Sequence, residues 1–147
     1  MCEMESILSS LDPQIQYLSH EFMADQVVFR AKARFVTAIC PYCGLEANKV
    51  HSKYRRVFQD IPISTFETVI HLELPKFFCI NIHCPYATFS VPLSFIEPKA
   101  RKTKRLEKEI LTLSLEMSSI NSAKRLNQQN IKISKSTICR LIKKKKL

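Results

Sequence analysis

Four cysteines, arranged as two close pairs, constrain the fold of this chain more than any other feature. The first pair lies in Cys40-Pro41-Tyr42-Cys43-Gly44, and the second pair, Cys79 and Cys84, follows after 35 intervening residues. Zinc binds four thiolates tetrahedrally in structural sites, and a close pair supplies two ligands from one turn. The spacing therefore predicts one zinc site that joins distant segments, with the ligands Cys40, Cys43, Cys79 and Cys84.

Gly44 supports this interpretation. It is the only glycine in the chain, and it directly follows the first pair. A turn that directs its backbone N–H groups toward a thiolate favours a residue with positive φ, and glycine tolerates such a φ because it has no Cβ. We therefore expect a left-handed backbone conformation at Gly44.

Other uses of these thiols fit the sequence less well. A disulfide framework would require an oxidising compartment, yet no apolar signal segment opens the sequence. A thioredoxin-like motif would use one Cys-x-x-Cys on a βαβ unit and would not need the second pair. Four residues separate the cysteines of the second pair, against two in the first, so the second pair is the less specific half of the motif. His83 therefore stays open as an alternative ligand to Cys84. Four further side chains are interpreted as ordinary surface, structural or unpaired groups: Cys2, His51, His71 and Cys139.

Charge is distributed unevenly along the chain, whose formal net charge is +10. Residues 1–30 carry −4, residues 31–98 carry +2 and residues 99–147 carry +12. Such a local excess indicates a polyanionic partner. The basic segment lacks bulky aromatic side chains that would enter a lipid interface, so nucleic acid is predicted rather than a membrane. We expect a cytoplasmic, nucleoid-associated protein with no small-molecule substrate.

Proline marks a boundary near residue 98, because all seven prolines lie at or before Pro98. Residues 1–25 are weakly informative and indicate only a short helix that ends at Asp12-Pro13. Residues 26–97 contain apolar and polar residues in the alternation typical of strands. The predicted strands cover 27–36, 50–58, 68–74 and 88–91. Together with the cysteine turns they predict a small zinc-ribbon-like β domain over 26–97, with a core too thin to fold without metal.

The proline-free tail, residues 98–147, predicts three helices. Apolar residues recur at helical spacing over 104–117, and shorter helices are expected over 122–129 and 135–144. A short helix, a four-residue turn and a second helix form the helix-turn-helix plan. The predicted fold class is therefore α+β, with a zinc-ribbon-like β domain followed by a three-helix helix-turn-helix domain and a basic tail.

The last predicted helix has two different faces. Ile138, Leu141 and Ile142 form an apolar face, which leaves a polar and basic face free for a DNA groove. Arginine can bind guanine bidentately, whereas lysines contact phosphates. A second basic cluster lies in the segment expected to be a flexible linker; it either follows the DNA backbone or only aids solubility. The predicted DNA contacts are Ser136, Thr137, Arg140, Lys143, Lys144, Arg101, Lys102 and Lys104, and the alternative is an ordinary three-helix bundle with a solvated face.

The ordered series of motifs resembles the N-terminal part of transposases of the ISL3 insertion-sequence family, over roughly residues 27–142. Two positions depart from the family pattern: Phe89-Ser90 stands where an acidic residue commonly follows the aromatic, and Lys99 replaces a common tyrosine. The residues that carry the likeness are Cys40-Pro41-Tyr42-Cys43-Gly44, Val50 to Arg56, Asp60-Ile61-Pro62, Lys76-Phe77-Phe78-Cys79, Cys84-Pro85, Ala100-Arg101-Lys102-Thr103 and Ser134 to Arg140.

The resemblance implies that the zinc-binding segment and the helix-turn-helix recognise the terminal repeats of the element in double-stranded DNA. In the family a later DDE domain, whose carboxylates hold divalent metals, performs strand cleavage and joining. After residue 98 the only acidic residues are Glu107, Glu109 and Glu116, all in one predicted helix. We therefore expect no catalysis from this chain alone. A stand-alone DNA-binding repressor and a zinc-ribbon module that binds proteins or forms a homodimer remain alternatives.

Overall fold

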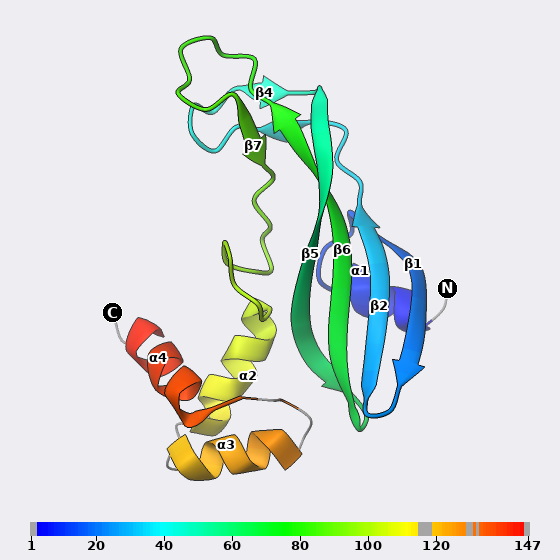
Figure 1. Cartoon of the computed structure of the whole chain (residues 1–147), viewed down its shortest axis with the longest axis vertical. Coiled ribbons are helices and arrows are strands. Elements are labelled where there is room, and N and C mark those ends of the chain that lie inside the picture. Colours follow the sequence, from blue (N-terminus) through cyan, green and yellow to red (C-terminus); the bar gives the residue numbers. More distant parts are fainter. Residues whose placement is uncertain (1–2, 115–118, 129–130, 132, 146–147) are drawn as a thin grey trace.

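A computed structural model describes residues 3–114, 119–128, 131 and 133–145, which form an α+β fold with a strand-rich sheet and four helices (Figure 1). None of the helices in these ranges is long and apolar enough to cross a membrane. In chain order the elements are α1 (Glu3–Ser9), β1 (Ile15–Met23), β2 (Gln26–Ala33), β3 (Ala38–Ile39), β4 (Glu46–Ala47), β5 (Val50–Ile63), β6 (Phe66–Phe78), β7 (Thr88–Ser90), α2 (Lys104–Ser114), α3 (Ser119–Gln128) and α4 (Lys135–Lys145).

The main sheet has the strand order β1-β2-β6-β5, and β7 pairs with one end of β6. β2 runs parallel to β6, from the pair Gln26–Glu67 to the pair Lys32–Glu73, and the other pairings are antiparallel. β3 and β4 form a separate two-stranded sheet beside the cysteines. The long β5–β6 hairpin therefore reaches from the cysteine loops at one end of the molecule to the helices near the other end (Figure 1).

The main sheet buries a core of its own. Apolar side chains of β2, β5 and β6 pack with Leu8 of α1 and with Leu93, Phe95 and Ile96, which follow β7. Phe29 and Ile70 are fully buried in this core, and Phe58 is 2% exposed. The body of the sheet therefore has a core that contains none of the four clustered cysteines, and the dependence of folding on metal stays a prediction. A separate small cluster at the cysteine end contains Phe77 and Phe89 together with Cys40.

The tail residues form α2, α3 and α4 close to the predicted positions, although residues 115–118 of the first predicted helix lie outside the described residues. These helices share a second apolar cluster that includes Leu106 of α2, Leu126 of α3 and Ile138 of α4, all fully buried. Ile61 of β5 packs against the same cluster. The helices are thus attached to the sheet through the far end of β5.

The segment before α2 is not the flexible linker that the sequence predicts, because it pairs with β5. Gln59 and Lys102 form a parallel β-bridge. The N–H of Gln59 donates to the carbonyl of Arg101 at 2.8 Å, and the N–H of Thr103 donates to the carbonyl of Gln59 at 3.0 Å. The guanidinium of Arg56 also donates to the carbonyl of Ala100 at 3.0 Å. Backbone and side-chain hydrogen bonds therefore hold the basic segment on the sheet.

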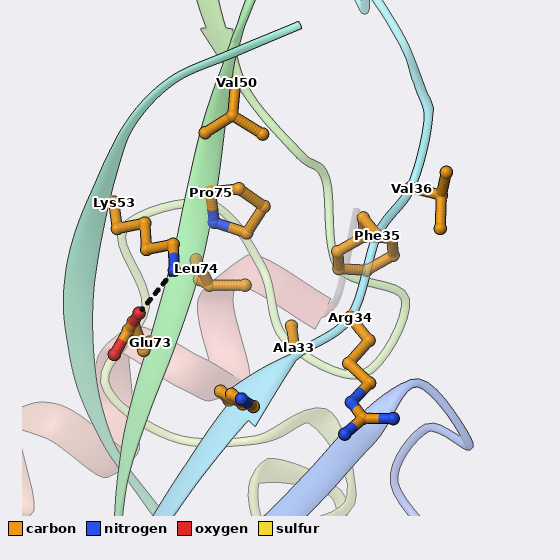
Figure 2. A pocket seen from close by; sticks show the side chains of 10 residues that line it. Ala33, Arg34, Phe35, Val36, Val50, Lys53, Glu73, Leu74 and Pro75 are labelled. Carbon is orange, nitrogen blue, oxygen red and sulfur yellow. Dashed lines mark ion pairs between the residues drawn. The ribbon is translucent and has the colours of Figure 1, made fainter. Parts of the chain in front are cut away.

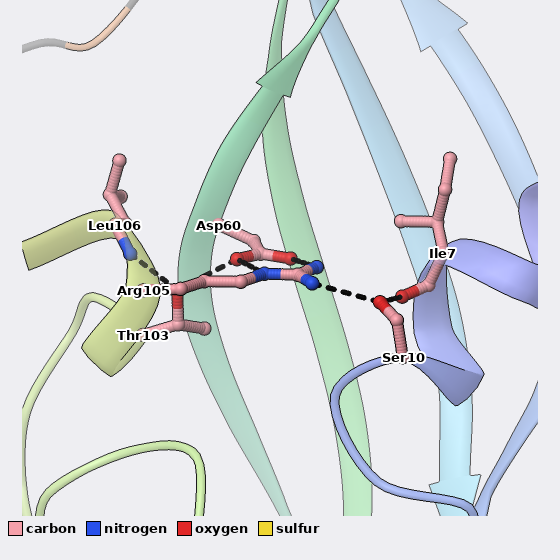
Figure 3. Close-up of polar contacts among 6 residues, drawn as sticks. All are labelled: Ile7, Ser10, Asp60, Thr103, Arg105 and Leu106. Atoms are coloured by element: carbon pink, nitrogen blue, oxygen red, sulfur yellow. Dashed lines mark hydrogen bonds and ion pairs between the residues drawn. The ribbon is translucent and has the colours of Figure 1, made fainter. Parts of the chain in front are cut away.

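Asp60 is the centre of a polar network that anchors α2 (Figure 3). Its side chain is 1% exposed. Oδ1 accepts hydrogen bonds from Thr103 Oγ1 at 2.7 Å and from Arg105 Nε at 2.9 Å, and Arg105 Nη2 forms an ion pair with Oδ2. Thr103 Oγ1 also accepts from the N–H of Leu106 at 3.3 Å, so Thr103 caps the helix. Arg105 Nη1 reaches Ser10 beyond α1 at 2.8 Å, which joins three parts of the chain.

Candidate zinc centre and nucleic-acid surface

The four predicted cysteine ligands come together at the end of the β5–β6 hairpin. Their Sγ atoms all lie within 4.8 Å of one another. The Sγ atoms of Cys43 and Cys79 are 3.5 Å apart, and those of Cys40 and Cys84 are 4.0 Å apart. A zinc ion with four sulfurs at ~2.3 Å requires sulfur–sulfur distances of ~3.8 Å in a regular tetrahedron. The observed spacing therefore fits a tetrahedral tetrathiolate site.

The backbone around the thiols is arranged to stabilise thiolates. Three N–H groups hydrogen bond to the sulfurs, each from the residue two positions after its cysteine: Leu45 to Cys43, Asn81 to Cys79 and Tyr86 to Cys84. Gly44 has φ of 81°, and its N–H donates to the carbonyl of Cys40 at 2.9 Å. The expected left-handed conformation of Gly44 is confirmed.

The thiols have very different pKa values without a metal. The hydrogen bond from the N–H of Leu45 lowers the pKa of Cys43 to about 7. At Cys79 the N–H of Asn81 favours the thiolate, but burial and the neighbouring thiols outweigh it and raise the pKa to about 12. The pKa of Cys84 is also raised: the N–H of Tyr86 favours its thiolate, but burial and adjacent thiols favour the neutral form. A divalent cation removes this conflict because it allows four close thiols to ionise together.

The histidines near the site have other contacts. The cluster of ligand atoms consists of the four cysteine sulfurs, while the backbone N–H of His83 donates to Asn81 Oδ1 at 3.0 Å. His51 packs edge-on against Phe78, with ring centroids 4.7 Å apart. His71 lies on β6 among cations, and burial, followed by repulsion from Arg55 and Arg30, lowers its pKa. The geometry thus favours Cys84 over His83 as the fourth ligand.

A pocket of about 330 Å³ lies where β2 leaves β6, between the sheet and the cysteine end (Figure 2). Lys53 and Glu73 form an ion pair of 3.6 Å at its wall, with side chains 68% and 47% exposed. Lys32 and Arg34 also line the pocket, and Arg34 Nε donates to Gln16 Oε1 at 2.7 Å. We assign no ligand to the pocket.

The predicted DNA-contacting residues of α4 lie on its solvent-facing side. Ile138 is fully buried, while Ser136, Arg140, Lys143 and Lys144 are exposed. Thr137 is half-buried; its N–H donates to Ser134 Oγ at 3.3 Å, and the two hydroxyls are 3.0 Å apart. Ser134 therefore caps the N-terminus of α4. The four exposed residues among the predicted contacts on α4 are one serine and three cations, with no apolar side chain among them.

The second predicted cluster, Arg101, Lys102 and Lys104, is only partly exposed to solvent. Arg101 is exposed, and Lys104 forms an ion pair with Glu97 at 3.9 Å. Lys102 is half-buried, and its pKa is lowered by burial first and then by repulsion from the cations of Arg101 and Arg140, against the attraction of Glu107. Leu106 of α2 and Ile138 of α4 pack in one apolar cluster, so the structure brings the start of α2 close to α4. This proximity of the two predicted clusters could not be inferred from their spacing in the sequence.

Sequence reasoning missed the residues that join the helices to the sheet. Asp60 and Thr103 stand in the motifs quoted above without an assigned role, and Arg105, the second residue of α2, is not among the predicted site residues. The sequence offers no local signal for this role, because Asp60 follows Gln59 just beyond the predicted strand 50–58. The partners of Asp60 lie 43 to 45 positions later, which no local pattern could indicate.

Residues 37–86 match the family model described as the zinc-finger of transposase IS204/IS1001/IS1096/IS1165, the zinc ribbon of the ISL3 transposases. No curated protein and no solved structure matches the chain. The matched range contains all four clustered cysteines and both turns that hold them. The metal is zinc. The match covers about a third of the chain and leaves α2, α3 and α4 outside it.

Proposed function

We propose that these residues form the DNA-recognition part of an ISL3-type transposase, which binds the terminal repeats of its element through α3 and α4. The zinc-finger match at residues 37–86 supports the transposase assignment. The observation that carries the DNA-binding proposal is the polar and basic face of α4, on which Ser136, Arg140, Lys143 and Lys144 are exposed while Ile138 is buried. Strand cleavage and joining lie outside the function proposed for these residues.

In this proposal α3 and α4 are a helix-turn-helix. Two hydrogen bonds join the end of α3 to described residues before α4: the N–H of Ile131 donates to the carbonyl of Leu126 at 2.8 Å, and Asn127 Nδ2 donates to the carbonyl of Ile133 at 3.0 Å. Ile131 and Ile133 are buried in the apolar cluster that the helices share. A recognition helix places its N-terminal residues against base edges in the major groove. α4, which starts at a capped N-terminus, would do the reading.

The proposed roles follow from exposure and chemistry. Arg140 is exposed and can bind guanine O6 and N7 with two hydrogen bonds, and Ser136 can contact either a base or a phosphate. Thr137 is held by Ser134, so its first role is to shape the start of α4. Lys143, Lys144 and the exposed Arg101 would contact phosphates, and half-buried Lys102 would contribute through its charge.

Zinc would act on DNA binding only indirectly. The metal orders the loops that hold its four cysteine ligands. Those loops lie at the opposite end of the β5–β6 hairpin from α2 and α3 (Figure 1). The residues that connect the sheet to the helices are instead Asp60, Thr103 and Arg105. In the proposed function, zinc therefore shapes a different part of the molecule from the part that reads DNA.

The test is fluorescence anisotropy with a labelled duplex that carries the element's terminal repeat and with a scrambled duplex. Each good base contact contributes about 1–3 kcal/mol of discrimination, so Arg140→Ala should lower the affinity for the repeat by roughly 5- to 150-fold and reduce the preference over the scrambled duplex. Lys143→Ala should lower the affinity for both duplexes by the same factor. It should also reduce the slope of the logarithm of the binding constant against the logarithm of the salt concentration by about 0.9.

Arg30→Ala is the matched control. Arg30 is on β2, far along the sheet from α4, and forms an exposed ion pair with Glu21 at 3.8 Å. Its removal should leave the affinity for both duplexes unchanged. The proposal is refuted if Arg140→Ala and Lys143→Ala bind the repeat as tightly as the wild type while the zinc content is normal.

A further inference from the structure

The zinc end of the molecule exposes an unusual number of large apolar side chains. Twelve large hydrophobic residues are exposed in the described part of the chain, and seven of them lie in the two segments 36–48 and 79–90 that contain the cysteines. We call these seven residues the apolar tip: Val36, Ile39, Tyr42, Leu45, Ile80, Ile82 and Tyr86. Soluble monomers rarely expose apolar patches larger than a few hundred square ångströms, and larger patches mark interaction sites.

A stacked pair of rings joins the two halves of the apolar tip. Tyr42 and Tyr86 stack on each other with ring centroids 3.8 Å apart, which joins the two cysteine loops at their surface. Ile39 and Ile80 each stand next to a cysteine of the quartet. With zinc bound, both loops are tied to one ion, so burying these side chains against a partner would cost little additional backbone entropy.

Charge argues that the partner of the apolar tip is a protein rather than a nucleic acid. None of the 23 lysines and arginines, and only Glu46 of the 13 acidic residues, lies in segments 36–48 and 79–90. A zinc ion with four thiolates has a net charge of about −2, which disfavours phosphate nearby. The two segments thus supply no cation beside the stacked tyrosines, and Lys49, which follows the first segment, lies over the Phe78 ring at 5.4 Å from its centroid.

The size of the apolar tip suits a dimer. Its seven side chains are 46–91% exposed. Large side chains offer ~150–250 Å² each when fully exposed, so together they present on the order of 800 Å², the area that one partner buries in a standard interface. A chain with net charge +10 repels its own copies most strongly through its basic tail, and the apolar tip is the nearly uncharged surface at the other end.

We propose that the apolar tip is the contact surface between two copies of this chain. An isologous contact places the same patch on both sides of a two-fold axis, so an apolar and nearly uncharged patch is complementary to itself. The two basic tails then point away from the contact, and both α4 helices stay free. The proposal does not depend on DNA binding by α4, because the two surfaces share no residues.

The experiment is sedimentation velocity of the zinc-loaded full chain without DNA, over a series of concentrations. We expect a reversible dimer with Kd of about 10 µM or tighter. Ile82→Asp should raise this Kd at least ~30-fold, because it brings two like charges together across the two-fold axis. Ile82 is 91% exposed, so the substitution should not disturb folding, and zinc content and circular dichroism should equal those of the wild type.

Leu18→Asp is the matched control. Leu18 is 49% exposed on β1, the edge strand of the sheet, and has no part in the apolar tip. The dimer should be unaffected by this change. The proposal is overturned if the zinc-loaded wild type stays monomeric up to ~100 µM, or if Leu18→Asp dissociates the dimer while Ile82→Asp leaves it intact.

Discussion

Replacing Asp60 with alanine should loosen the helices from the sheet. The carboxylate is 1% exposed, and it accepts hydrogen bonds from Thr103 at 2.7 Å and from Arg105 at 2.9 Å. Its removal leaves the buried Thr103 hydroxyl without its acceptor, which costs about 1–3 kcal/mol. Removing one partner of a fully buried ion pair costs about 3–5 kcal/mol. Arg105 is 34% exposed, so water compensates for part of that loss.

We therefore expect Asp60→Ala to lower the free energy of unfolding by about 3 kcal/mol. Urea denaturation at fixed zinc concentration, followed by circular dichroism, measures this change. For a chain of this size the shift in Tm is ~2–4 °C per kcal/mol, so ~6–12 °C is expected. Limited proteolysis should also cut the segment before α2 more readily, because Arg101 and Lys102 would be held less firmly.

Glu73→Ala is the control for this prediction, since Glu73 forms an ion pair with Lys53 on the same β5–β6 hairpin but at an exposed site. Exposed pairs contribute ~0–1 kcal/mol, so its effect should be much smaller. The reasoning would be refuted if Asp60→Ala and Glu73→Ala destabilise the protein equally, or if Asp60→Ala leaves the urea midpoint unchanged. In a double-mutant cycle with Arg105→Met, a coupling below ~0.5 kcal/mol would show that the pair does not act together.

Three further predictions concern the zinc end. Removing zinc with a chelator should disorder the cysteine loops but leave the main sheet folded, because Phe29, Phe58 and Ile70 pack in a core separate from the cysteines. The circular dichroism spectrum should keep its strand signal, and a random-coil spectrum would contradict this prediction. Zinc affinity should rise with pH, because zinc displaces protons from the thiols that it binds. The pKa of Cys43 is about 7, so below pH 7 its proton must be displaced as well. In competition with a chromophoric chelator, the zinc affinity should therefore fall by about one additional factor of ten for each pH unit below 7. Gly44→Ala should weaken zinc binding by about 1 kcal/mol from its φ of 81° alone, because no atom lies within 4 Å of the added Cβ; an unchanged affinity in the same competition assay would contradict this.

The zinc site could be predicted from the sequence because its signal is local and chemically specific. Two close pairs of thiols at this spacing have few uses other than metal binding. The helices were predicted for a similar reason, since apolar residues at helical spacing identify α2 and α4 without knowledge of their neighbours. In both cases residues within a few positions of one another carry the information.

The rest of the sheet depends on contacts between distant residues. β1 has no clear alternation, because a bulge between Tyr17 and Ser19 moves the pattern from one face to the other. β2 pairs in parallel with β6, which begins 40 residues after β2 begins, and nothing in either strand indicates that choice. Asp60 lies just beyond the predicted strand 50–58, and nothing in its sequence neighbours indicates that Thr103 and Arg105 contact it.

The β5–β6 hairpin explains why zinc binding and the proposed DNA reading occupy separate ends. β5 has 14 residues, and at ~3.3 Å per residue it is about 45 Å long. The cysteine quartet follows from one end of this hairpin, and Asp60 and Ile61 attach the helices near the other. Two copies joined at the apolar tip could hold their α4 helices up to ~90 Å apart, which leaves room for half-sites separated by more than one helical turn of DNA, ~34 Å.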